Sequence, residues 1–151
     1  MTIEIEAIGT VKSPVTEGVD ADWGGVISQI HIKGELASGL KGLEEFSDLL
    51  VIFWLHRSTF AADSDLVRRP QGRDDMPLVG IFAQRAKHRP NPIGVTAVKL
   101  LAVEGNILTV RGLDAIDGTP VLDIKPYYPA YDCRATTQVP EWVGRLMKDY
   151  F

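Results

Sequence analysis

The sequence predicts a mainly β protein, a small closed antiparallel β-barrel with one short internal helix and a C-terminal helix. Many short segments have the two-residue apolar spacing of strands, and turn-forming residues separate them. Helical spacing is confined to two short stretches. No strand leads through a glycine-rich turn into a helix, and strands do not alternate regularly with helices, which argues against a doubly wound nucleotide-binding fold.

The strands are expected to be short and numerous. Apolar residues alternate over 3–11, with a slip at Gly9 that predicts a bulge, and again over 26–33. Residues 48–55 form a continuous apolar run, typical of a central strand that is buried on both faces. Further strands are expected at residues 79–83, 94–101, 107–112 and 121–124, with a hairpin turn at 104–106.

The helices and the long loop complete the expected architecture. Leu36, Leu40, Leu43 and Phe46 recur at three- and four-residue steps and predict one short amphipathic helix. Pro140 at a first helical turn predicts a C-terminal helix over about 140–150. Residues 61–78 are expected to form a polar loop of unusual length, a feature that is commonly functional. We expect a single domain, residues 1–151, with a core over about 5–132.

Composition narrows the functional classes. The net charge of −4 argues against broad electrostatic binding to nucleic acid. No apolar run approaches the ~20 residues that cross a bilayer, so we expect no membrane partner. Cys133 is the single cysteine and forms no internal disulfide, which favours a cytoplasmic location. No histidine, cysteine or carboxylate set has metal-ligand spacing, so no metal is expected.

The segment 80–94 is a strand that leads into a stiff, basic turn. Pro90 and Pro92 fix their own φ angles and favour extended conformations before them, so a ligand can order the turn at low entropic cost. Arg85 and Arg89 are suited to a carboxylate or phosphate, and Asn91 offers both a donor and an acceptor. The alternative is a proline-braced hairpin connection with solvated arginines.

Basic residues are concentrated in this part of the chain. Seven lie within residues 68–89: Arg68, Arg69, Arg73, Arg85, Lys87, His88 and Arg89. They form either a solvated charged surface or a basic patch beside a site for an anionic ligand.

The segment 113–128 is a second candidate site. Asp114, Asp117 and Asp123 alternate with aliphatic residues around a tight turn, and such carboxylates can accept hydrogen bonds from ribose hydroxyls or an ammonium group. Alternatively, Asp114 and Asp117 cap the turn through bonds to the backbone. Asp123 and Lys125 point to the same face of the expected strand, as an inward or an exposed ion pair.

Two further side chains are candidates. His56, which precedes Arg57 at the end of the apolar strand, is either a proton shuttle or an edge histidine with a structural role. Trp23 lies in a polar loop and either stacks on a purine or anchors the loop to the core. No nucleophile with an activating base is recognisable.

The two long motifs together resemble those of one family. Residues 82–94, FAQRAKHRPNPIG, and 114–127, DAIDGTPVLDIKPY, are similar to motifs of the TsaA-like, or TrmO, family. Ile8–Pro14, Gly42–Asp48 and Phe53–His56 are similar too, and the resemblance covers residues from about 5 to 132.

The resemblance implies a small β-barrel and a homodimer with S-adenosylmethionine near the subunit interface. It implies methylation of N6 of threonylcarbamoyladenosine beside the anticodon of tRNA. The implied cofactor contacts are His56, Arg57, Arg85, the backbone around Val95, and the run Asp114, Ala115, Ile116 and Asp117. Residues expected to contact the acceptor or complete the pocket are Trp23, His88, Arg89, Asn91, Lys125 and Tyr127.

One segment departs from the family pattern. Family members that act on tRNA carry a Pro-Arg-Gln element after the Ser-Pro motif, whereas this chain has the acidic stretch Asp20–Gly25 there. The difference favours an alternative methyltransferase that acts on a small molecule. A module that binds S-adenosylmethionine without turnover is a third hypothesis. The catalytic residues are unassigned, with His56 and Asn91 as candidates, and of these His56 is the candidate proton acceptor.

Overall fold

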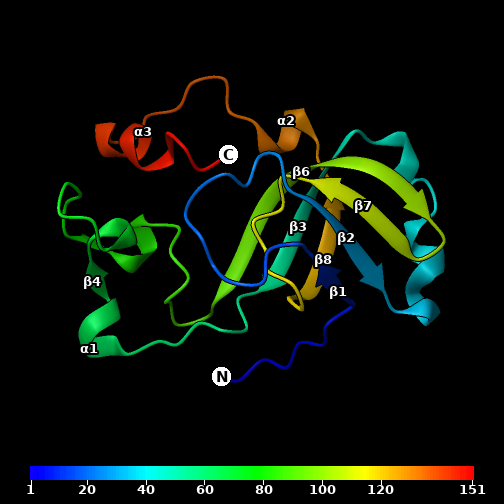
Figure 1. The fold of residues 1–151 in the computed structure, drawn as a ribbon, viewed down its shortest axis with the longest axis horizontal. Coiled ribbons are helices and arrows are strands. Elements are labelled where there is room, and N and C mark those ends of the chain that lie inside the picture. The colour runs from blue at the N-terminus through cyan, green and yellow to red at the C-terminus, as the bar shows by residue number, and fades with distance from the viewer.

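The computed structural model describes all 151 residues, and its centre is a closed barrel of six antiparallel strands (Figure 1). The strand order is β1-β2-β7-β6-β3-β8, and β8 pairs with β1 to close the barrel. The barrel strands are β1 (Gly9–Lys12), β2 (Ile27–Ile32), β3 (Asp48–Trp54), β6 (Ile93–Glu104), β7 (Ile107–Arg111) and β8 (Pro120–Pro126). The predicted fold class is therefore confirmed.

The remaining elements are short. The α-helices are α1 (Ala62–Asp65), α2 (Pro129–Asp132) and α3 (Glu141–Met147). The 3₁₀ helices are η1 (Gly34–Leu40), η2 (Leu43–Glu45), η3 (Pro70–Gly72) and η4 (Ile81–Ala83). β4 (Val67–Arg68) and β5 (Val79–Gly80) pair with each other outside the barrel. The internal helix expected around residues 36–46 is thus two 3₁₀ helices, broken at Gly42, whose φ is 87°.

The barrel interior holds the main hydrophobic core. Alternate residues of each strand point inward, as in β3, where Leu49, Val51 and Phe53 are buried. Thirteen residues form the core cluster: Val11, Ile30, Ile32, Leu40, Leu49, Val51, Phe53, Val98, Leu108, Val110, Leu113, Ala115 and Val121. The turn at Glu104–Asn106 joins β6 to β7 as predicted, with Gly105 at φ 62°.

Four expectations for the local structure need correction. The strand expected over 3–11 begins only at Gly9, because the partners of β1 end at Ile32 and Val121. β3 is buried on alternate residues instead of both faces, since its outer side chains cover the outside of a barrel. The strand expected at 79–83 ends at Gly80, where η4 begins. The long loop over 61–78 contains α1, β4 and η3.

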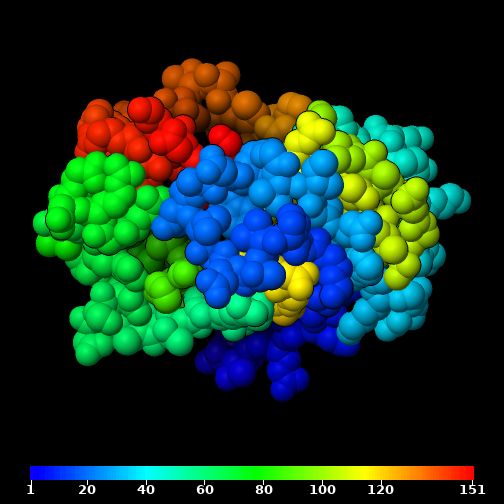
Figure 2. Space-filling model, viewed as in Figure 1, coloured from blue at the N-terminus to red at the C-terminus, as the bar shows by residue number.

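The antiparallel order places three connections at one end of the barrel. The β1–β2 loop (13–26), the β3–β6 segment (55–92) and the β7–β8 loop (112–119) all leave from this end. We call it the site end. η1, η2 and the β6–β7 hairpin lie at the opposite end. After α2 the chain returns, and α3 lies over the β3–β6 segment (Figure 1). In the space-filling view residues 141–151 contact both that segment and the β1–β2 loop (Figure 2).

Candidate functional site

β6 extends past the end of β7 at the site end and so exposes part of one edge. Its pairing with β7 begins at Lys99, whereas its pairing with β3 already begins at Ile93. Residues 93–98 are therefore paired on one side only. Backbone and side chains of this free edge are available to the loops that surround it, and Val95 and Thr96 are the residues these loops use.

Two oppositely charged side chains form hydrogen bonds to adjacent residues of this edge. Arg85 donates a hydrogen bond from Nη2 to the carbonyl oxygen of Val95. The hydroxyl of Thr96 donates to Oδ1 of Asp114, which comes from the β7–β8 loop. Thr96 is 7% exposed, so this contact fixes Asp114 from within the barrel wall. The structure thus brings together three of the predicted cofactor contacts, Arg85, Val95 and Asp114.

Asp114 has a second partner that comes from residues 141–151. The Tyr150 hydroxyl donates to Oδ2 of Asp114 at 2.6 Å. Burial, followed by the charge of Asp114, raises the pKa of the Tyr150 phenol well above its ordinary range, while the charge of Arg85 acts in the opposite direction. Tyr150, Asp114 and Arg85 therefore form one electrostatically connected group.

Asp117 and Arg57 hold the β1–β2 loop against the same end of the barrel. Oδ1 of Asp117 accepts a hydrogen bond from the backbone nitrogen of Ser13 at 3.0 Å. Arg57 donates Nη1 to the carbonyl of Thr16 at 3.0 Å. Neither Asp114 nor Asp117 caps its own turn, because their carboxylates accept hydrogen bonds from Thr96 and Ser13. Within the turn, the Thr119 hydroxyl donates to the carbonyl of Ile116. Ala115 and Ile116 lie between the two aspartates, and Ala115 packs into the core.

The proline-braced turn is positioned mainly by backbone contacts. Nδ1 of His88 donates to the carbonyl of Thr59 at 2.8 Å, which links the turn to the segment after His56. Arg89 donates to the carbonyls of Gln84 and Ala86, at 3.1 and 3.3 Å, so it does not extend freely to a ligand. Asn91 is exposed and His56 is half-buried.

Gly94 is required by close approach. A Cβ at this position would lie 2.5 Å from the Phe53 ring, so only glycine lets the start of β6 lie against that ring.

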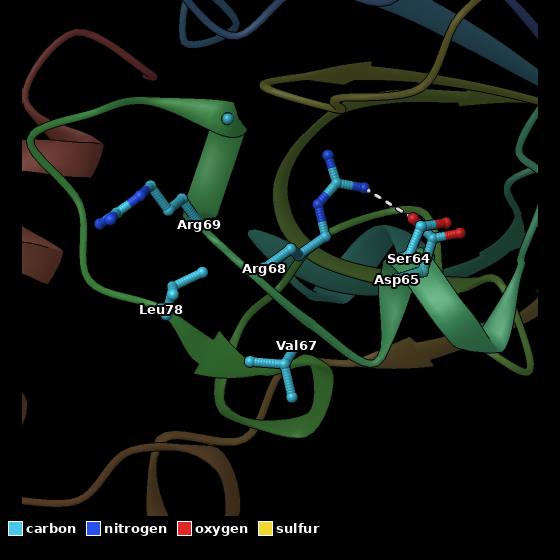
Figure 3. A pocket seen from close by; sticks show the side chains of 7 residues that line it. Ser64, Asp65, Val67, Arg68, Arg69 and Leu78 are labelled. Carbon is cyan, nitrogen blue, oxygen red and sulfur yellow. Dashed lines mark hydrogen bonds and ion pairs between the residues drawn. The ribbon is translucent and has the colours of Figure 1, made fainter.

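The basic cluster is largely tied down. Arg68 pairs with Asp65 at 3.1 Å, Arg73 pairs with Asp75 at 2.7 Å, and Arg69 donates to the carbonyl of Met76. A hollow of about 480 Å³ lies here, lined by Ser64, Asp65, Val67, Arg68, Arg69, Gly72 and Leu78. Figure 3 shows Arg68 directed toward Asp65, with Arg69 extending the other way. None of its lining residues belongs to the Arg85–Asp114 group, so we do not place the site there.

Three predicted pocket residues occupy other environments. Trp23 is 2% exposed and its Nε1 donates to the carbonyl of Val19 at 3.0 Å, so it anchors its loop and offers no free face for stacking. Lys125 forms an exposed ion pair with Asp123 at 2.7 Å. Tyr127 lines a separate hollow of about 370 Å³ with Asp48 and Lys99. Lys125 and Tyr127 lie at the end of β8 opposite the site end, about 20 Å along the strand from Pro120.

Two residues of the group were missed from the sequence. Thr96 is an ordinary inward strand residue by pattern, and nothing in the sequence links it to Asp114. Tyr150 follows Trp142, Val143, Leu146 and Met147 at helical spacing, which predicts a core-facing residue. The hydrogen bond from its hydroxyl to Asp114, 36 residues earlier in the chain, cannot be predicted from that pattern.

The arrangement offers a cation, a carboxylate and a free strand edge within one group. This combination can bind a zwitterionic ligand, because Arg85 complements a carboxylate while Asp114 complements an ammonium or hydroxyl group. The structure has no cluster of three or more histidine, cysteine or carboxylate side chains of the kind that holds a metal ion. None of its helices has the length and apolar character that a membrane crossing requires.

Comparison with known proteins gives a consistent match. Residues 19–133 match the model of the tRNA-methyltransferase O N-terminal domain. A probable S-adenosyl-L-methionine-binding protein of Methanothermobacter thermautotrophicus is 44% identical over 87% of this chain and 95% of its own length. A tRNA (adenine(37)-N6)-methyltransferase of Mus musculus is 46% identical over 62% of this chain. The crystal structure of TrmO from P. aeruginosa superposes with a TM-score of 0.76 over 94% of this chain, at 31% identity.

Several of these relatives are longer than this chain. The alignments span 62% of the P. aeruginosa chain, 21% of the mouse protein and 36% of one archaeal relative. The part that the family model matches includes strands β2 to β8, most of the site-end loops and the Arg85–Asp114 group, whereas β1, α3 and Tyr150 lie outside it.

Proposed function

The chain belongs to the TrmO family, and from this premise we propose that it is an S-adenosylmethionine-dependent methyltransferase that modifies N6 of threonylcarbamoyladenosine beside the anticodon of tRNA. The observation that carries the proposal is the attachment of Arg85 and Asp114 to adjacent residues of the free β6 edge. A relative that spans nearly the same residues is named for binding this cofactor, and a mammalian relative is named for the tRNA reaction.

The charged groups present fit S-adenosylmethionine. The cofactor carries an amino-acid carboxylate and ammonium, a sulfonium and a ribose, so it needs both a cation and anions around it. Arg85 would hold the carboxylate, and Asp114 would accept from the ammonium or the ribose hydroxyls. His56, Arg57 and Asp117 would line the adjoining side, where Arg57 and Asp117 already order the 13–16 segment.

The chain's own residues then have to align two reactants and exclude water. When bound, the cofactor supplies a methyl group that its sulfonium already activates, so no covalent nucleophile is needed. The stiff turn at Pro90 and Pro92 would place Asn91 and His88 beside the acceptor. His56 is the candidate that would take the proton from the acceptor, whereas the Asn91 amide would hold the acceptor through hydrogen bonds. The general base is otherwise unassigned.

Titration of the purified protein with S-adenosylmethionine tests the cofactor. Replacement of Arg85 by alanine should raise the Kd about 10- to 100-fold, because one charge-assisted contact is lost. Arg111→Ala is the matched control, since Arg111 is an exposed arginine of β7 that forms no ion pair. Unchanged affinity in Arg85→Ala would refute the assignment, and no heat with the unmodified protein at millimolar ligand would refute the cofactor.

Nucleoside analysis tests the acceptor. Digested tRNA from cells with and without the gene should differ in N6-methylated threonylcarbamoyladenosine, measured by mass spectrometry. Complementation with an Arg85→Ala variant should leave the methylation deficient, and complementation with Arg111→Ala should restore it. Methylation that does not depend on the gene would refute the tRNA proposal.

A second candidate is methylation of a small molecule. It is favoured by the Asp20–Gly25 loop, which is acidic and packs against residues 149–151, and by the net charge of −4. Purified protein that binds the cofactor, but transfers no methyl group to tRNA from a strain lacking the gene, would support this candidate. A module that binds S-adenosylmethionine without turnover is distinguished by the absence of methyl transfer to any added acceptor.

We further propose that the protein acts in the cytoplasm as one domain, residues 1–151, in a homodimer whose interface lies near the site. Exposed apolar side chains close to the free β6 edge, such as Val95 at 41% exposure, support an interface there. Light scattering at micromolar concentration tests the assembly, and a monomeric mass would refute the interface.

A further inference from the structure

Residues 141–151 are held against the site end at several points. In α3, Arg145 donates Nη2 to the carbonyl of Asp75 at 3.0 Å and pairs with Glu141. Arg145 also lies 3.9 Å from the Asp75 carboxylate, which Arg73 holds. α3 is therefore tied to the β3–β6 segment by a network of opposite charges.

The residues after α3 are tied to the β1–β2 loop. The carbonyls of Asp149 and Tyr150 accept hydrogen bonds from the backbone nitrogens of Asp22 and Trp23, at 2.9 and 2.8 Å. A Cβ at Gly24 would lie 2.6 Å from the carbonyl carbon of Phe151, so the loop approaches residue 151 as closely as a glycine permits. Two consecutive backbone bonds fix the direction in which the Tyr150 side chain points.

That direction leads into the candidate cofactor site. The Tyr150 hydroxyl lies 2.6 Å from Oδ2 of Asp114, and Thr96 occupies Oδ1 of the same carboxylate. Both oxygens of Asp114 are thus held by donors from different parts of the chain. A carboxylate has about four lone-pair positions, so roughly two stay available to a ligand.

We propose that Tyr150 is a positioning residue of the cofactor site, which fixes the Asp114 carboxylate in the orientation that binds S-adenosylmethionine. The inference rests on the proposed function, because it assumes that Asp114 contacts the cofactor. Residues 149–151 and the Asp20–Gly25 loop together then form one side of the site. The Asp20–Gly25 loop occupies the place of the family's Pro-Arg-Gln element. Residues 149–151 lie beyond the part of the chain that the family model matches.

Fixing the carboxylate favours binding for an entropic reason. A carboxylate that rotates freely loses conformational freedom when it binds a ligand, whereas one held at both oxygens has already lost it. The phenol is suited to this role because it is protonated, and therefore a donor, throughout the neutral range, and its raised pKa extends this state to higher pH.

The test begins with Tyr150→Phe, which removes the hydroxyl and keeps the ring. The Kd for S-adenosylmethionine, measured by calorimetry, should rise by about 5- to 30-fold. Tyr131→Phe is the matched control, since Tyr131 is 81% exposed and its hydroxyl has no partner, and its affinity should be unchanged. Unchanged affinity in Tyr150→Phe would overturn the proposal, and tighter binding would overturn it too, because the phenol would then compete with the ligand.

A double-mutant cycle separates positioning from a structural contribution. In an Asp114→Asn background, Tyr150→Phe should cause less than about a twofold further loss of affinity, because it acts through the Asp114 carboxylate. An equal loss in both backgrounds would mean that Tyr150 acts independently of Asp114, which overturns the proposal. No binding by the unmodified protein would refute the proposed function itself, whereas normal binding that Tyr150→Phe leaves unchanged would refute only the role of Tyr150.

Discussion

The barrel and the site end are held together by different forces. In the barrel, thirteen buried residues form one core cluster, and strand pairing is continuous around the sheet. At the site end, the buried apolar side chains outside that cluster are Trp23, Met76 and Ile81. The loops there have long paths and few apolar contacts, so burial alone does not determine their positions.

Hydrogen bonds from arginine side chains hold many of the site-end loops in position. Arg57, Arg85 and Arg145 each donate a hydrogen bond to a backbone carbonyl of another loop or strand. Arg69 and Arg89 donate to backbone carbonyls within the β3–β6 segment itself. An exposed guanidinium bond contributes little to stability but fixes where a loop lies. Substitutions in the barrel should therefore change the free energy of unfolding, whereas substitutions at the site end should change ligand binding more than stability.

The largest effect is expected from a cavity in the barrel. Leu108 is fully buried in β7, and Leu108→Ala should lower the free energy of unfolding by about 2–5 kcal/mol, measured by urea denaturation. Leu101→Ala is the control, since Leu101 in neighbouring β6 is 40% exposed and should lose less than about 1 kcal/mol. Equal losses in the two variants would contradict the picture of a barrel stabilised by its interior.

The sequence predicted the barrel better than it predicted the site. Alternating apolar residues locate β2 and the hairpin between β6 and β7, since a half-buried strand needs that period. The continuous run over 48–55 was misread because outward residues such as Leu50 and Ile52 are also aliphatic. In a closed barrel such residues lie on the outside, and composition does not distinguish the two faces.

The sequence identifies part of the Arg85–Asp114 group because the motifs are local, whereas the geometry of the group depends on residues far apart in the chain. Arg85 and Asp114 were identified from charge and turn chemistry, and Val95 from resemblance. The burial of Met76, which is 1% exposed, could not be predicted, because a single apolar residue in a polar loop has no periodic pattern around it. Arg89 was expected to bind a ligand, yet its bonds to Gln84 and Ala86 carbonyls place it in the support of the turn. Sequence gives a residue's chemistry but not the partner that uses it.

A substitution at Gly94, where the barrel meets the site end, should have an intermediate effect on the free energy of unfolding. Gly94→Ala would place a Cβ 2.5 Å from the Phe53 ring, and the overpacking should cost about 1–3 kcal/mol of unfolding free energy. The Cβ lies where β6 leaves the turn, so the variant should also weaken S-adenosylmethionine binding. Gly39→Ala, in η1 with open space around it, should leave both stability and binding unchanged. If Gly94→Ala is as stable as the unmodified protein, the start of β6 can shift to accommodate the added Cβ, as a loop would, and the prediction is wrong.

The smallest effect concerns the ion pairs that hold α3. The Arg73 guanidinium, with a smaller contribution from Arg145, lowers the pKa of the Asp75 carboxyl below its usual value. A carboxyl with a lowered pKa stabilises the folded state above pH ~4, and this contribution is lost as the pH falls further. The melting temperature of Asp75→Asn should therefore lie slightly below that of the unmodified protein at pH 7, and the gap should narrow as the pH falls below about 4. The change in melting temperature should be small because the Asp75 carboxylate and its arginine partners are exposed to solvent. Asp74→Asn is the control, since the exposed Asp74 carboxylate forms no ion pair, and its melting temperature at pH 7 should match that of the unmodified protein. A large loss of stability in Asp75→Asn at pH 7 would contradict the comparison, because the site end would then contribute to stability as the barrel does.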